Sequence, residues 1–235
     1  MTHEKNTILG FFSDWTLWEK SWLSISVILM LTLSLYWKDS AIGIIASLTG
    51  IICVVLVAKG RISNYYFGIV NVVAYAYVAY GWQYYGEVML NLLYFLPIQF
   101  YGIWYWMKNR KQSNKDEVYV KFMSNRQRIM WGLISVASII GYGVVLKMIK
   151  GSLPFIDSTS TVLSIIAMIL MVRLYMEQWI LWIIVDVVSI IMWVVVLMKG
   201  GNDIAILIMW TAYLVNAVYG LVNWIKLYKA QGARR

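Results

Sequence analysis

The sequence predicts an all-α integral membrane protein in a 3+1+3 arrangement: two parallel three-helix repeats joined by a linker helix, with one extra N-terminal helix. Composition is the first observation behind this class. Of the 235 residues, 61% are hydrophobic and only 13% are charged, whereas soluble domains are about 45–50% apolar and about 25% charged. So few polar side chains cannot cover a water-facing surface. The other two observations are the long runs of apolar residues and a motif that recurs near the end of the chain.

Eight apolar segments are long enough to be membrane spans, for which a helix needs about 20 residues within a range of about 17–25. None alternates polar and apolar residues as a barrel strand does. Each is therefore predicted to be a helix that satisfies its own backbone hydrogen bonds. The first segment is short, and we favour a span over an interfacial helix for it. The eight segments are 21–37, 41–58, 64–82, 88–107, 129–149, 159–175, 178–198 and 204–225.

The basic residues predict which side of the bilayer each loop occupies, because cytoplasmic loops carry an excess of Lys and Arg. With eight spans, only four of the 20 Lys and Arg residues lie on the side away from the C-terminus: Lys38, Lys147, Lys150 and Lys199. The C-terminus and the loop 108–128 are therefore predicted to be cytoplasmic. The net charge of +9 is spread over short loops, which is typical of membrane topology and argues against a nucleic-acid partner.

An internal repeat is visible in the sequence. Tyr101–Lys108 aligns with Tyr219–Lys226 at a spacing of 118 residues, and Asn71 aligns with Asp186 at a spacing of 115 residues. Equivalent spans are an even number of crossings apart, so the copies are predicted to run parallel, as in transporters whose site lies at the repeat interface. The predicted divisions are a tail and extra helix (1–40), the first repeat (41–107), a basic loop and linker helix (108–158), the second repeat (159–226) and a C-terminal tail (227–235).

Asp186 is the only acidic residue well inside a predicted span. A carboxylate at the centre of a membrane helix costs about 2.5–3.5 kcal/mol on insertion scales, so it is expected to face the bundle interior or water. Helical spacing puts four residues on the same face as Asp186, which predicts indole rings on both sides of the carboxylate. A purely structural pairing of Asp186 with another helix stays open. The four residues are Trp179, Trp182, Ser189 and Trp193.

The last span of each repeat carries a second polar stripe. Asn91 and Gln99 share a face in the first copy, where Pro97 is expected to kink the helix. Tyr213 and Asn216 share a face in the second copy. Packing roles stay open, because carboxamides also bond between membrane helices and Trp near span ends also forms interfacial belts. The candidate substrate-binding residues are Trp182, Asp186, Gln99, Asn216, Asn91, Asn71, Tyr213 and Trp179.

These side chains suit a flat polar ring compound that is neutral or cationic. Aromatic faces attract a cation by about 0.5–2 kcal/mol each, and Asp186 balances its charge. The interiors of the spans lack Lys and Arg, since Lys147 and Arg173 lie two residues from span ends, so an anion or a phosphate ester is predicted to be excluded. No metal or other cofactor is expected, because the single histidine, His3, lies in the tail and the single cysteine, Cys53, lies in an apolar run. An intramembrane enzyme is disfavoured because Asp186 has no deep acidic mate.

The motif Trp179-x-x-Trp182-x-x-x-Asp186, the Tyr-Gly-x-x-x-Trp-x-Lys ends of both copies and the 3+1+3 plan together resemble the PnuC family of bacterial vitamin transporters, over residues 41–226. The resemblance implies a SWEET-like architecture and a homotrimer in the bacterial cytoplasmic (inner) membrane. It also implies facilitated diffusion of nicotinamide riboside for NAD biosynthesis, made one-way by cytoplasmic phosphorylation. Relatives that carry thiamine or riboflavin keep those vitamins open as alternatives, and so does a proton-coupled symporter that uses Asp186.

On this interpretation the pyridinium ring of nicotinamide riboside stacks on Trp182, and Asp186 either neutralises the ring or accepts hydrogen bonds from the ribose. Which end of the ligand lies toward which residue stays open. The phosphorylated form is expected to be rejected, because a dianion has no partner in the spans and trapping requires that rejection. The residues expected to pair with the carboxamide or the ribose hydroxyls are Gln99, Asn216, Asn91 and Asn71.

Overall fold

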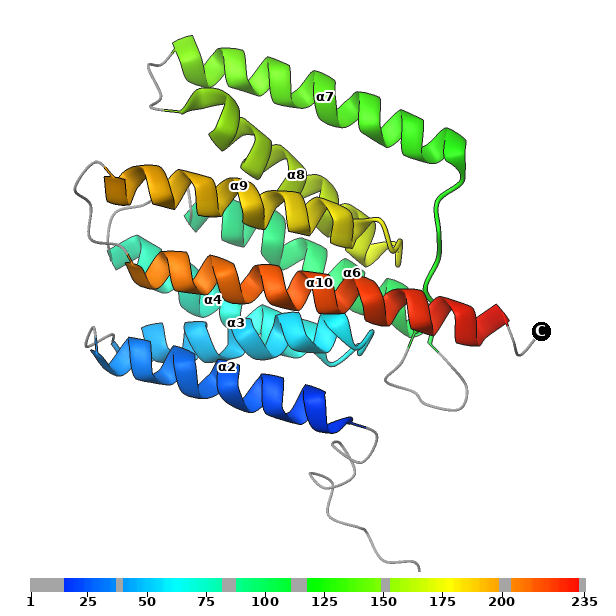
Figure 1. The fold of residues 1–235 in the computed structure, drawn as a ribbon, viewed down its shortest axis with the longest axis horizontal. Helices are drawn as coiled ribbons and strands as arrows, with labels where there is room; N and C mark the ends of the chain where they lie inside the picture. Colours follow the sequence, from blue (N-terminus) through cyan, green and yellow to red (C-terminus); the bar gives the residue numbers. More distant parts are fainter. Residues whose placement is uncertain are drawn as a thin grey trace, which may run out of the picture.

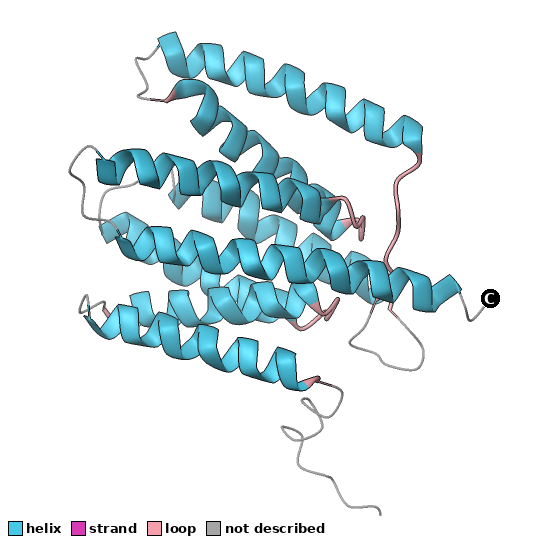
Figure 2. Cartoon of the chain, viewed as in Figure 1, coloured by secondary structure: helices cyan, strands magenta, loops and turns pink. Residues whose placement is uncertain are grey.

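The structure is a computed structural model that describes residues 15–36, 40–81, 88–110, 118–148, 153–198 and 204–232. These residues form helices and connecting loops without a strand, as Figure 2 shows. The helices lie side by side in one bundle, with α2 at one edge and α7 at the opposite edge (Figure 1). They are α2 (Leu17–Tyr36), α3 (Ala41–Ala58), α4 (Asn64–Gly81), the π-helical η1 (Leu90–Phe95), α6 (Leu96–Lys108), α7 (Asn125–Met148), α8 (Pro154–Val172), α9 (Gln178–Met198) and α10 (Ile204–Gly232).

The predicted all-helical class is confirmed, and the predicted spans 41–58 and 178–198 coincide with α3 and α9. The described apolar part of α9, Gln178–Met192, is shorter than a full span. Residue 37, at the end of the first predicted span, and the side chain of Trp193 lie outside the described residues. Four helices of the described chain are long and apolar enough to cross a membrane on their own: Ala41–Ala58, Asn125–Met148, Pro154–Val172 and Leu207–Gln231.

Helices α2 and α7 begin with the same kind of cap. Thr16 N donates to Glu19 Oε2 at 2.7 Å and Glu19 N donates to Thr16 Oγ1 at 3.2 Å. Ser124 N donates to Gln127 Oε1 at 3.0 Å and Gln127 N donates to Ser124 Oγ at 3.3 Å. Both are capping boxes, which satisfy two N-terminal donors reciprocally. The cap explains why α7 begins at Asn125, four residues before the predicted start of the span.

The turns after α3 and α8 end their helices in the same way. Each contains one residue in the left-handed region, Gly60 with φ 68° and Leu174 with φ 66°. In both turns its N–H donates to the carbonyl three residues earlier and the following N–H donates to the carbonyl five residues earlier, which is a Schellman motif. Helix α8 therefore ends at Val172, before the predicted limit at residue 175. A non-glycine residue in this conformation costs about 1–2 kcal/mol, and the fully buried side chain of Leu174 offsets that cost.

An extended segment, residues 118–123, holds these two turns together. Val118 N donates to Gly60 O at 3.3 Å, and Lys121 N donates to Leu174 O at 2.8 Å. Met176 N donates back to Lys121 O at 2.9 Å. The segment then continues to the start of α7 (Figure 1). The two helix ends are thus fixed relative to each other at one end of the bundle.

The largest core cluster lies at this same end. It contains Leu174 and Val118 together with the rings of Tyr65, Trp106, Trp179 and Trp224. All four rings are buried, with exposed fractions between 0% and 3%. Helices α4, α6, α9 and α10 therefore meet around aromatic side chains beside the two turns.

Helix α6 is preceded by a π-helical turn at the point where Pro97 was expected to bend the chain. Leu96 N donates to Asn91 O, five residues earlier. Pro97 lies in the first turn of α6 and lacks the N–H that would continue the α-helical pattern. The wider π turn accommodates this break, and such turns are frequent at functional sites.

Candidate functional site

Asp186 is buried on α9, with only 3% of its surface exposed. Its carboxylate makes no hydrogen bond or ion pair with any residue in the described part of the chain. It lies eight residues, or about 12 Å at the 1.5 Å rise of an α-helix, beyond the start of α9. Burying a carboxylate without a partner at this depth costs free energy, and ionisable residues retained inside membrane helices usually serve a function. Asp186 is therefore a functional-site candidate.

Tyr213 on α10 and Asn71 on α4 lie close to this position. The Tyr213 hydroxyl is within electrostatic range of Asp186. A Cβ atom on Gly50 of α3 would lie 2.8 Å from Asn71 Nδ2 and 3.9 Å from the Tyr213 hydroxyl oxygen. Gly50 therefore lets α3 approach both side chains, and the structure brings Asn71, Tyr213 and Asp186 into one region. Asn71 also donates to Ala46 O at 2.8 Å.

Gln99 on α6 has an available acceptor. Its side chain is 5% exposed, and its Oε1 atom is buried without a hydrogen-bond partner among the described residues. A Cβ atom on Gly68 of α4 would lie 2.6 Å from Gln99 Nε2, so the glycine makes room for the carboxamide. A buried carbonyl oxygen without a partner costs about 1–3 kcal/mol, a cost that an incoming donor removes.

Asn216 on α10 is already engaged between helices. Its Nδ2 donates to Val54 O of α3 at 3.1 Å, and its Oδ1 accepts from Trp22 Nε1 of α2 at 3.3 Å. Both atoms of the carboxamide are therefore used in joining α2, α3 and α10.

The three remaining candidates lie in different surroundings. Trp179 is 3% exposed and packs over Gly220, whose Cβ position is 2.5 Å from the indole. Trp182 is only partly buried and packs on the edge of the same core cluster. Asn91 is 6% exposed within η1. Of these, Trp182 has the most ring surface left for a ligand.

Buried cations lie away from Asp186. The buried Lys and Arg of the described chain are Lys59 and Arg61, in the turn after α3. Lys59 Nζ lies 2.8 Å from Glu19 Oε1 and 4.8 Å from the centroid of the Trp15 ring. The sequence reading missed this buried ion pair, for which the Thr16-x-x-Glu19 capping box was the only available signal.

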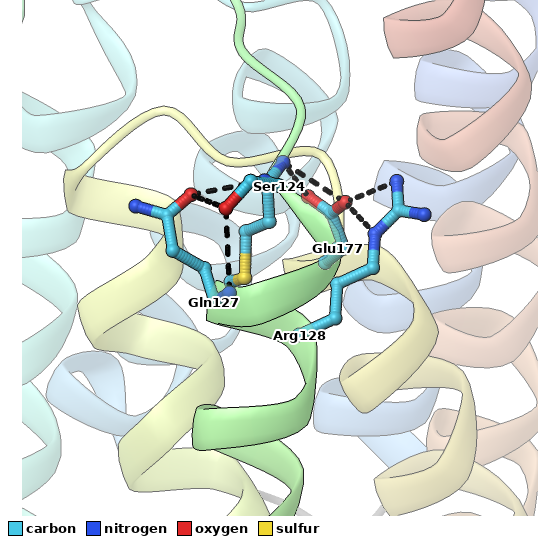
Figure 3. Close-up of polar contacts among 5 residues, drawn as sticks. Ser124, Gln127, Arg128 and Glu177 are labelled. Carbon is cyan, nitrogen blue, oxygen red and sulfur yellow. Dashed lines mark hydrogen bonds and ion pairs between the residues drawn. The ribbon is translucent and has the colours of Figure 1, made fainter.

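A groove of about 370 Å³ lies between α7, α8 and α9, outside the region of Asp186. At one end Glu177 accepts from Met123 N and pairs with Arg128 at 2.9 Å, next to the Ser124–Gln127 cap (Figure 3). These contacts attach the start of α7 to the turn before α9. The groove is lined mainly by apolar side chains, including Trp131, Leu170 and Leu181.

A bundle of apolar helices that buries an unpaired carboxylate among aromatic and carboxamide side chains defines a multi-pass membrane transporter. A family model described as "Nicotinamide mononucleotide transporter" matches residues 40–226, and the chain belongs to this family of transporters.

Named relatives agree with that assignment. The chain is 40% identical over 225 residues to a protein of Neisseria mucosa named nicotinamide riboside transporter PnuC, covering 93% of this chain and 84% of that protein. It is 35% identical over 220 residues to the protein of the same name from Haemophilus influenzae, covering 93% and 94%. The Escherichia coli protein of that name is 28% identical over 225 residues, covering 85% and 90%.

A solved structure shares the fold. The crystal structure of the vitamin B3 transporter PnuC superposes with a TM-score of 0.78 at 39% sequence identity, covering 94% of this chain and 95% of that one. The resemblance to the PnuC family expected from the motifs is therefore confirmed at the level of both sequence and fold.

Proposed function

We propose that this protein carries nicotinamide riboside across the bacterial inner membrane by facilitated diffusion and so supplies NAD biosynthesis. One observation carries the proposal: Asp186 is a buried carboxylate without a described partner. A cationic ring balances that charge, and nicotinamide riboside is a pyridinium that also bears a carboxamide and a ribose. The relatives named as transporters of this compound, at 40% and 35% identity, support the same substrate.

In this proposal Asp186, Trp182 and Gln99 make the principal contacts. The ring stacks on the partly exposed indole of Trp182, and Gln99 Oε1, which lacks a partner, accepts from the substrate carboxamide or a hydroxyl. Tyr213, Asn71 and Asn91 complete the polar lining. Asn216 and Trp179 serve the site by holding α10 and α9, because their side chains already pack between helices.

The riboside is favoured over its phosphate, although the family description names the mononucleotide. A phosphate dianion needs a cation, and the buried Lys59 is already paired with Glu19 in the turn after α3. The other buried cation among the described residues, Arg61, lies in the same turn. We therefore propose that cytoplasmic phosphorylation traps the substrate inside the cell without coupling to an ion or to ATP.

The 3+1+3 arrangement is part of the proposal, with divisions at 1–40, 41–107, 108–158, 159–226 and 227–235. It is supported by the matching turns at Gly60 and Leu174, which are 114 residues apart. The spacing between Asn71 and Asp186 in the sequence alignment is 115 residues, which is one residue more. At the turn spacing the equivalent of Asp186 is Val72, which is 5% exposed compared with 3% for Asp186, so the carboxylate has an apolar counterpart.

The proposal also covers the assembly of the protein and its topology in the membrane. We propose a homotrimer with one substrate path in each protomer, a spanning α2 and a cytoplasmic C-terminus. The basic loop 108–128 supports the orientation, since Lys and Arg concentrate on the cytoplasmic side.

Uptake into proteoliposomes tests the function. Vesicles containing the protein are expected to accumulate labelled nicotinamide riboside down its gradient and to exclude nicotinamide mononucleotide. Preferential uptake of thiamine or riboflavin in the same panel would show that this vitamin, and not nicotinamide riboside, is the substrate. If uptake depends on an imposed proton gradient, the mechanism is symport through Asp186 and not facilitated diffusion.

A further inference from the structure

Two indole side chains form hydrogen bonds from one half of the bundle to the other. Trp106 of α6 donates from Nε1 to Val172 O at 3.0 Å and to Met171 O at 3.2 Å, at the end of α8. Trp224 of α10 donates from Nε1 to Val57 O at 2.9 Å, at the end of α3. Each third helix is thus attached to the end of the first helix of the other proposed repeat.

The two indoles also fill the space between the halves. Trp106 and Trp224 are both fully buried, and their ring centroids are 6.0 Å apart. Tyr65 meets Trp106 edge-on at 5.1 Å, and Trp179 meets Trp224 edge-on at 6.0 Å. Trp179 precedes Asp186 by seven residues on α9, or about 10 Å along the helix. A substrate leaving Asp186 toward this end therefore meets four packed rings.

Two of the three carbonyls that accept from these indoles keep another hydrogen bond when the indoles leave. Val57 O also accepts from Gly60 N, and Met171 O also accepts from Leu174 N, both at 2.9 Å. The Schellman turns therefore keep Val57 O and Met171 O satisfied when the indoles leave, whereas Val172 O loses the hydrogen bond from Trp106. The segment 118–123 ties the two turns together, so separation at this end must move α6 and α10 away from the ends of α8 and α3.

We propose that Trp106 and Trp224 are the gate residues at this end, which the proposed topology places toward the cytoplasm. Transport requires both crossed indole–carbonyl contacts to break together with the aromatic packing. The inference rests on the proposed transport function, and its test uses no substrate, so that the two can fail separately.

The native Cys53 reports opening at this gate. It lies on α3, is partly buried and packs against the cluster that contains both indoles. In oriented vesicles, a membrane-impermeant thiol reagent is added to one side at a time and the rate of Cys53 modification is measured. Trp106→Phe and Trp224→Phe keep an aromatic ring, remove the donating N–H and leave a smaller ring in the same place. Trp104→Phe on the same helix, where the indole is 57% exposed, is the matched control.

Each Trp→Phe change at the gate is expected to raise the rate from the C-terminal side by roughly two- to tenfold, the shift that follows from one hydrogen bond. The rate from the other side and the rate in Trp104→Phe are expected to stay at the wild-type value, and Cys53→Ser is expected to abolish modification. Unchanged rates in both gate variants, with helical content preserved, would overturn the gate. An equal rise from both sides would overturn it as well, since it indicates general loosening.

Discussion

Glu19 Oε1 lies 2.8 Å from Lys59 Nζ, and both side chains are more than nine-tenths buried. The pair joins the first turn of α2 to the turn after α3, and Tyr219 of α10 donates to the same carboxylate oxygen. The family match begins at residue 40, so α2 lies outside it. The extra helix is nevertheless attached to both proposed repeats through one carboxylate.

Removing one partner of this pair is expected to destabilise the protein strongly. Glu19→Ala leaves the Lys59 ammonium buried without its carboxylate, which costs about 3–5 kcal/mol. Thermal unfolding of the purified protein in detergent measures the change. Lys20→Ala, at the adjacent exposed position, is the control and is expected to stay within about 0.5 kcal/mol of wild type. Equal melting temperatures for the two variants would show that the pair does not anchor α2.

A methyl group at Gly220 is expected to disrupt the α9–α10 contact. The added Cβ would lie 2.5 Å from the Trp179 ring, and overpacking of this kind costs about 1–3 kcal/mol. Gly132→Ala on α7 is the matched control, because nothing lies within 4 Å of its Cβ position. That change is expected to leave stability equal or to raise it by up to about 1 kcal/mol. A Gly220→Ala variant as stable as Gly132→Ala would contradict the packing.

Pro97, which directly follows the π-helical turn η1, is expected to matter for binding. Pro97→Ala restores an N–H, which allows η1 to relax into α-helix and turns Asn91 away from its present face. The affinity for nicotinamide riboside is expected to fall by about tenfold, equivalent to one well-placed hydrogen bond. The other proline of the chain, Pro154, lies in the first turn of α8, where no N–H is needed. Pro154→Ala should therefore bind like wild type, and an equal loss in both variants would remove the special role of η1.

Much of the fold was predictable from local signals. The spans 41–58 and 178–198 are bounded by charged and turn residues, and both match their helices. The start of α7 was placed too late because Arg126 and Arg128 look like loop residues, whereas the Ser124–Gln127 cap makes them helical. The end of α8 was placed too late because Leu174 gives no glycine signal for a left-handed turn.

The candidate site was predictable as a set of residue types but not as a set of contacts. The burial of Asp186 followed from the cost of a carboxylate in lipid. The bonds of Asn216 to Val54 and Trp22 did not, because these residues lie 162 and 194 positions away in the chain. Only the packing of α2, α3 and α10 determines whether that carboxamide faces a neighbouring helix or a ligand.

The most direct test of the central claim is the affinity of purified Asp186→Asn for nicotinamide riboside, measured by titration calorimetry beside wild type. Asp157→Asn, an exposed carboxylate at the start of α8, is the control and should bind as wild type does. If Asp186 balances the pyridinium charge, its neutralisation weakens binding by more than about thirtyfold, since truncating one partner of a buried charge pair costs about 2–5 kcal/mol. An Asp186→Asn affinity within about twofold of wild type, a difference below 0.5 kcal/mol, would contradict the account.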